Sequence, residues 1–119
     1  MNAPRKFSGP LHEKSYYFAL NAIRFCRTLM MQQKEYILSK QLLRSSTSIG
    51  ANISEAQQTQ SSADFISKLS IALKEANEAR FWLHLIQDSD FGETKNSLRD
   101  LDEIIRMLVS SIQTARMKR

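Results

Sequence analysis

The sequence holds little cysteine, proline or glycine: its 119 residues include one Cys, two Pro and three Gly. A single cysteine excludes an intramolecular disulfide framework and a zinc finger of the cysteine-rich kind. So few turn-forming residues argue against a β-sandwich or barrel rich in turns. Because no proline lies between Leu11 and Arg119, long uninterrupted helices are expected.

Long apolar runs are also absent. No stretch approaches the roughly 20 apolar residues of a membrane span, and residues 1–6 lack the apolar core of a signal peptide. Apolar residues still make up 42% of the chain, which argues against wholesale disorder, and the length suits one domain. These features predict a small cytoplasmic protein without a membrane partner.

Apolar residues recur at helical spacing in four segments. Each segment is predicted to form a helix with a core seam, over about 12–32, 36–58, 62–88 and 94–117. In the second segment the seam consists of Leu42, Ser46, Ile49, Ile53 and Ala56. Helices of similar length with short loops predict an all-α fold, an antiparallel up-down-up-down four-helix bundle over residues 12–119. Residues 1–11, which hold both prolines, are expected to form an irregular N-terminal arm.

One stretch of the second helix opposes this pattern. Residues 45–51 are almost all small, and Gly50 is a poor helix former, since glycine costs about 1 kcal/mol relative to alanine. Propensity therefore indicates a loop, whereas periodicity indicates a helix. We follow the periodicity, because small side chains let neighbouring backbones approach closely while Ile49 and Ile53 anchor the face.

Local signals mark some of the helix ends. Ser61 followed by Asp64 resembles a capping box at the start of the third helix. The turn over residues 88–92 ends in Gly92, for which a positive φ is expected. The break near residues 32–35 contains neither Gly nor Pro, so its signal is weak.

No motif typical of catalysis or of a cofactor site is present. His12 and His84 lack the spacing of paired metal ligands, and Cys26 lies on the apolar stripe of the first helix, as a buried free cysteine does. The glycines are isolated and form no phosphate-binding loop. We therefore expect no enzymatic activity, no catalytic or metal-binding residue and no cofactor.

The carboxylates leave one enzymatic alternative open. Glu75 and Glu78 share a face of the third helix and Glu55 lies in the second, and four-helix bundles can hold di-metal sites between such residues. Those sites also need Glu-x-x-His pairs, which this sequence lacks. Ion pairs or capping within the bundle are therefore favoured over a metal site.

Positive charge is concentrated in the first half of the chain. The net charge is +5, and residues 1–60 hold eight basic and three acidic residues, which accounts for the whole excess. A basic surface attracts phosphates without reading sequence. We therefore predict RNA or DNA contacts from Arg5, Lys6, Lys14, Arg24, Arg27, Lys34 and Lys40. The alternative is that so modest a charge only provides solubility, although several copies in an oligomer would sum to a larger field.

Residues 42–56, LLRSSTSIGANISEA, resemble the signature of the four-helix-bundle proteins encoded by intervening sequences in bacterial large-subunit ribosomal RNA genes. The matching residues are Leu42, Arg44, Ser48, Ile49, Asn52, Ile53 and Glu55. Gly50 replaces a frequent proline of that family, and Ala56 replaces its glycine. A second segment, residues 64–83, resembles the family's third helix at Phe65, Ile71, Ala72, Glu78, Trp82 and Leu83.

The resemblance implies an antiparallel four-helix bundle that associates as a ring-shaped homopentamer and has no established enzymatic activity. A similar protein is the accessory factor of diversity-generating retroelements, where a basic pentamer engages nucleic acid and a reverse transcriptase. The partners implied by the resemblance are therefore further copies of the chain, RNA or DNA, and a reverse transcriptase.

The matched polar residues are assigned to contacts within the bundle or between subunits. Asn52 and Glu55 lie three residues apart on the second helix and so project together. Glu78 is expected to pair with Arg44, either between helices or between subunits, and to fix register more than it adds stability.

A second function stands beside nucleic-acid binding. Surfaces built from small residues and from the aromatic residues Phe81, Trp82 and Phe91 would make the chain a structural or protein–protein interaction module without nucleic-acid binding. The salt dependence of binding distinguishes the two functions, because phosphate contacts weaken steeply as salt rises whereas apolar contacts do not.

Overall fold

The computed structural model of the chain describes residues 5–118 and contains, within that range, four α-helices and no β-strand. The helices are α1 (Pro10–Gln33), α2 (Ile37–Ala56), α3 (Ser62–Asp88) and α4 (Lys95–Met117). The prediction of an all-α protein with four helices is confirmed. α1 begins at Pro10, inside the expected arm, where proline needs no N–H partner. Residues 1–4 of that arm and Arg119 lie outside the described residues.

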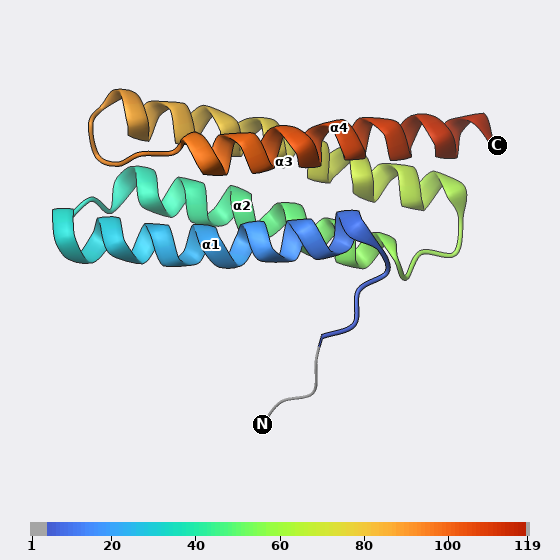
Figure 1. Ribbon diagram of the computed structural model, residues 1–119. Coiled ribbons are helices and arrows are strands. Elements are labelled where there is room, and N and C mark those ends of the chain that lie inside the picture. Colours follow the sequence, from blue (N-terminus) through green and yellow to red (C-terminus); the bar gives the residue numbers. More distant parts are fainter. Residues whose placement is uncertain (1–4, 119) are drawn as a thin grey trace.

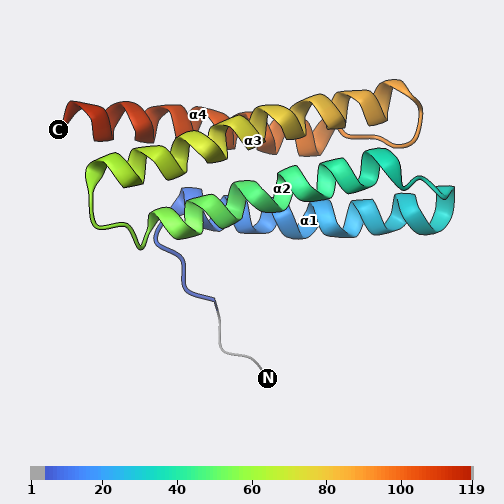
Figure 2. The same cartoon turned by 180° about the vertical axis from the view of Figure 1, so that it is seen from behind.

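The helices lie in two layers (Figure 1). α1 and α2 form one layer and α3 and α4 form the other, and the chain turns back at each of the three loops (Figure 1, Figure 2). α2 packs against both α1 and α3, and α4 packs against both α3 and α1. Each helix therefore has two neighbours, and the apolar faces of all four helices meet in one core.

The core consists largely of the seams that the spacing predicts. All five seam residues of α2 are buried, and Leu42, Ile49 and Ile53 have no exposed surface. α3 contributes a series of buried alanines together with Leu69 and Leu83. Removal of this apolar surface from water is the main force that holds the helices together. Among the described helices, none combines the length and apolar character that crossing a membrane requires.

Gly50 lies within α2, so the small-residue stretch is helical, as the periodicity predicts. A Cβ atom added to Gly50 would lie 3.3 Å from the carbonyl oxygen of Ser15 on α1. Contacts this short at a backbone atom leave little room for adjustment. The absence of a side chain at Gly50 therefore allows α1 and α2 to pack closely.

Replacing Gly50 by valine is expected to lower the free energy of unfolding by about 1–3 kcal/mol through overpacking against Ser15. Helix propensity alone predicts the opposite sign, because valine is a better helix former than glycine. The matched control is Ala51→Val at the neighbouring exposed position, where only the propensity cost of about 0.7 kcal/mol or less applies. Urea unfolding of both variants checks this, and a Gly50→Val protein as stable as wild type would contradict it.

The turn between α1 and α2 is closed without glycine. Lys34 takes the left-handed conformation with φ 56°, and the buried carboxylate of Glu35 caps α2. This carboxylate accepts hydrogen bonds at 2.8–3.1 Å from three backbone N–H groups, those of Ile37, Leu38 and Ser39, and one at 3.0 Å from the Ser39 hydroxyl. Burial opposes ionisation of Glu35, but these bonds outweigh it and hold the pKa of Glu35 below its ordinary value of 4.5.

Of the two predictions made for the ends of α3, the cap before the helix is confirmed and the glycine conformation in the turn after it is wrong. The Ser61 hydroxyl accepts a hydrogen bond from the Asp64 N–H at 3.1 Å, which confirms the cap. In the turn before α4 the residue with positive φ is Asp90, at 64°, and not Gly92; aspartate tolerates this conformation better than most residues. Gly92 is needed for space instead, because a Cβ atom there would lie 3.0 Å from the ring of Phe25.

Candidate nucleic-acid interface

Arg24 and Arg27 form the centre of the candidate interface on the outer face of α1. They lie one turn apart, both are exposed, and they line a shallow hollow with Thr28, Met31 and Gln32. Among residues 5–118, neither arginine takes part in an ion pair, and no described acidic residue lines the hollow. Two guanidinium groups without acidic partners are suited to phosphate oxygens, which they bind in a bidentate manner.

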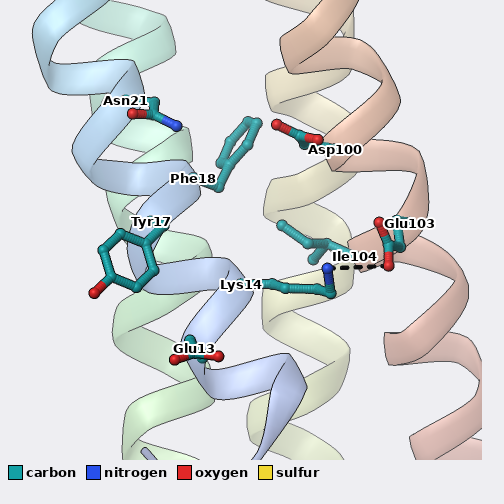
Figure 3. A pocket seen from close by; sticks show the side chains of 8 residues that line it. All are labelled: Glu13, Lys14, Tyr17, Phe18, Asn21, Asp100, Glu103 and Ile104. Carbon is teal, nitrogen blue, oxygen red and sulfur yellow. Dashed lines mark ion pairs between the residues drawn. The ribbon is translucent and has the colours of Figure 1, made fainter. Parts of the chain in front are cut away.

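Lys14 lies on the same helix, but Glu103 offsets its charge. The Lys14 Nζ atom is 3.1 Å from a carboxylate oxygen of Glu103 on α4 (Figure 3). The pair borders a hollow of about 360 Å³ between α1 and α4, which is lined by the buried side chains of Phe18 and Ile104. A phosphate would have to compete with Glu103, so we expect Lys14 to be less available to a phosphate than the two arginines.

The other predicted contacts lie at the ends of α1 and on α2. Arg5 and Lys6 are exposed and precede α1, Lys34 is exposed and follows its last turn, and Lys40 is exposed on α2. The 24 residues of α1 span about 36 Å at 1.5 Å per residue. The predicted residues therefore do not form one compact patch. We call the exposed basic residues on α1 and at its two ends the basic face: Arg5, Lys6, Lys14, Arg24, Arg27 and Lys34.

Arg44 joins α2 to α3 through two carboxylates of the same chain. Its guanidinium donates to Glu75 at 2.7 Å and also to Glu78, and the Trp82 indole N–H donates to Glu78 at 3.1 Å. The hydrogen bonds from Trp82 and Arg44 lower the pKa of Glu78. The structure thus places the pair of Arg44 and Glu78 between helices of one chain. The ion pairs expected for Glu75 and Glu78 are therefore present. Sequence reasoning did not name Arg44 as the partner of the buried Glu75, which shares the arginine because it lies three residues before Glu78 on one helix face.

Asn52 and Glu55 make separate contacts. The Asn52 side-chain amide donates to the backbone carbonyl of Ser48 at 2.8 Å within α2. Glu55 forms an ion pair with Lys68 of α3 at 3.1 Å. Glu55 therefore helps to join α2 to α3, while Asn52 supports α2 alone.

The profile of the 23S rRNA-intervening sequence protein family matches residues 11–110 of the chain. The chain belongs to this family. Both segments that resemble it, residues 42–56 and 64–83, lie within the matched range, and the resemblance is confirmed. Arg24 and Arg27 of the basic face also lie in the part that the intervening-sequence family shares, whereas Arg5 and Lys6 precede it.

A solved structure from Bacteroides thetaiotaomicron VPI-5482, described as a protein with unknown function from the S23 ribosomal protein family, is similar to this intervening-sequence family member. The two chains are 46% identical with a TM-score of 0.85, and the comparison covers 87% of this chain and 98% of the other. No curated protein matches the chain significantly. The comparisons therefore give a shared architecture and a family whose function is unknown.

The three aromatic residues of the alternative function differ in exposure. Phe81 on α3 is 56% exposed and packs edge-on against Trp82, with ring centroids 5.0 Å apart. Trp82 and Phe91 are partly buried against the core. Of the three, Phe81 is therefore the side chain most available to a protein partner.

Replacing Glu78 by alanine is expected to lower the free energy of unfolding by about 0.5–1 kcal/mol, because a partly exposed ion pair is worth little and Arg44 keeps Glu75. Subunit number should stay unchanged, since the pair lies within one chain. The matched control is Asp102→Ala, which removes the exposed ion pair with Arg80. Denaturant unfolding and light scattering check this, and a changed mass for Glu78→Ala alone would show that Glu78 acts between subunits.

Proposed function

We propose that this intervening-sequence family member is a cytoplasmic, non-enzymatic homopentamer that binds RNA or DNA through the basic face of α1 without reading sequence. The observation that carries the proposal is the pair of exposed arginines, Arg24 and Arg27, in a hollow whose described lining contains no acid. Phosphate oxygens are the ligand that such a pair fits, and sequence-independent binding follows from contacts to phosphates alone.

Assembly multiplies the effect of this surface. We propose that each subunit is an antiparallel up-down-up-down bundle and that five subunits form a ring, as the family resemblance implies. Five copies of a chain with net charge +5 would carry about +25 on one particle. A field of that size attracts nucleic acid more strongly than the charge of a single subunit does.

A role without catalysis is supported by the surroundings of the candidate nucleophile and metal ligands. Burial raises the pKa of the Cys26 thiol to about 11, and the nearby carboxylate of Glu35 adds to the rise, so the reactive thiolate is disfavoured at neutral pH. Among the described residues, no group of three or more His, Cys, Asp or Glu side chains is placed to hold a metal ion.

The alternative function is a structural or protein–protein interaction module, and the exposure of Phe81 favours it. Aromatic side chains are enriched at protein interfaces. A reverse transcriptase is the partner that the family resemblance offers for this surface. This alternative needs no phosphate contact and predicts association that is insensitive to salt.

A binding titration at two salt concentrations tests the proposal. A fluorescent oligonucleotide is titrated with the protein at about 50 mM and about 200 mM salt, and light scattering gives the mass of the particle. We expect a pentamer whose affinity falls at least tenfold between the two conditions. Binding that is absent or unchanged by salt would overturn the phosphate-binding function, and a mass other than five subunits would overturn the pentamer.

A further inference from the structure

Aromatic side chains gather at the start of α1, next to the basic face. The ring of Phe7 lies 5.3 Å from that of His12, 5.4 Å from that of Tyr16 and 5.9 Å from that of Tyr17, measured between centroids. Tyr16 and Tyr17 also meet edge-on at 5.4 Å. These contacts hold the segment before α1 against the helix and leave four rings in one surface cluster.

Arg5 is held in this aromatic cluster. Its Nε atom donates a hydrogen bond to the Tyr16 hydroxyl at 2.9 Å, and its guanidinium carbon lies 5.4 Å from the centre of that ring. A guanidinium at this distance from an aromatic ring is attracted to it without losing its charge. Arg5 and the exposed Lys6 therefore place positive charge beside the rings.

Tyr17 is the most accessible ring of the cluster. It is 47% exposed, and it lies on the α1 side of the hollow that Lys14 and Glu103 border (Figure 3). Arg24 follows Tyr17 by seven residues, two helical turns, so both project from the same side of α1 about 10 Å apart along the axis. Glu13, the single acidic residue of α1, lines the same hollow as Tyr17, and no acidic residue lies between Tyr17 and Arg24 on the helix. A strand that contacts the arginines can therefore continue along α1 to the rings.

We propose that the cluster formed by Arg5, Phe7, Tyr16 and Tyr17 is a stacking platform for unpaired bases, so that the basic face prefers single-stranded RNA or DNA to duplex. Bases in a duplex are stacked on one another, whereas those of a single strand present free faces to aromatic side chains and to arginine. Phosphate contacts alone give no such preference. This inference rests on the proposed function and names its substrate class.

Fluorescence anisotropy tests the platform with a single strand of about 20 nucleotides and a duplex of the same length. We expect wild type to bind the strand about tenfold more tightly than the duplex, and the ratio to grow as salt weakens the phosphate contacts. Tyr17→Ala should lower the affinity for the strand about tenfold and keep the affinity for the duplex within about twofold of the wild-type value. Tyr17→Trp should restore the affinity for the strand. Phe81→Ala, which removes an exposed ring from α3, should change the affinity for neither ligand.

The outcomes separate the platform from the proposed function. Equal affinity of wild type for strand and duplex, or an equal loss of both in Tyr17→Ala, would overturn the platform. If charge reversal at Arg24 and Arg27 abolishes binding of both ligands while Tyr17→Ala changes neither, phosphate binding stands and the platform is wrong. Absence of any binding overturns both. Circular dichroism and thermal unfolding of each variant confirm that the fold is intact. Tyr17→Leu provides a bulky apolar replacement without a ring.

Discussion

Replacing Glu35 by alanine is expected to lower the free energy of unfolding by about 2–3 kcal/mol, because it removes a buried carboxylate that accepts hydrogen bonds from four donors, two of them on the buried Ser39. The carboxylate receives three backbone N–H groups of α2 and the hydroxyl of Ser39. Hydrogen bonds to a charged group contribute more than neutral ones, and unpaired buried donors carry a desolvation penalty. Urea unfolding at neutral pH measures the loss.

The matched control for Glu35 lies at the start of α4. Glu93 is exposed and accepts one backbone N–H bond, from Lys95 at 2.9 Å. Because water can replace this bond, Glu93→Ala is expected to cost less than about 1 kcal/mol. Equal losses in the two variants would show that burial and the number of donors at Glu35 are unimportant.

The same carboxylate predicts the direction of a pH dependence. Since the pKa of Glu35 is lower in the folded protein than its ordinary value of 4.5, its ionised form stabilises the fold fully above about pH 5, and this stabilisation is lost as pH falls through the folded-state pKa. Wild type should therefore lose its advantage over Glu35→Gln across the acidic range below about pH 5, as pH falls through the folded-state pKa. An advantage that stays constant over this range would contradict the assignment.

The turn at Glu35 shows why some parts of the fold are readable from sequence and others are not. Helix positions follow from periodicity, because each buried seam must repeat at the helical period, and the seam of α2 identifies five buried residues correctly. A cap of the usual type is also local, and Ser61 shows it. Glu35 lies two residues before α2 and reaches forward into it, an arrangement without a distinctive sequence pattern.

Contacts between distant segments limit the prediction further. The space that Gly92 provides is set by Phe25 of α1, so a turn rule based on neighbouring residues assigns the glycine the wrong role. The charge of Lys14 is offset by Glu103, which lies in the neutral second half of the chain. Charge counted along the sequence therefore identifies the basic first half of the chain, residues 1–60, whereas the choice among its residues requires the packing of α4 against α1.

Arg24 and Arg27 are the residues whose replacement is expected to have the greatest effect on binding. Reversing both to glutamate takes the net charge of each subunit from +5 to +1 and puts acids where phosphates are proposed to bind. We expect at least a hundredfold loss of affinity for an oligonucleotide at about 50 mM salt. The milder Arg24→Ala/Arg27→Ala variant should reduce the slope of log affinity against log salt by about 1.4–1.8, as expected for two lost phosphate contacts per binding site.

α4 offers the control that separates position from total charge. Arg99 and Arg106 are exposed and seven residues apart, and no ion pair of the described residues includes them. Their double reversal to glutamate changes the net charge by the same amount as reversal of Arg24 and Arg27. If the basic face of α1 is the interface, the affinity of the α4 variant for the oligonucleotide should fall less than about tenfold, because only the long-range field changes. Equal losses would mean that the particle's total charge attracts nucleic acid and that α1 provides no particular site.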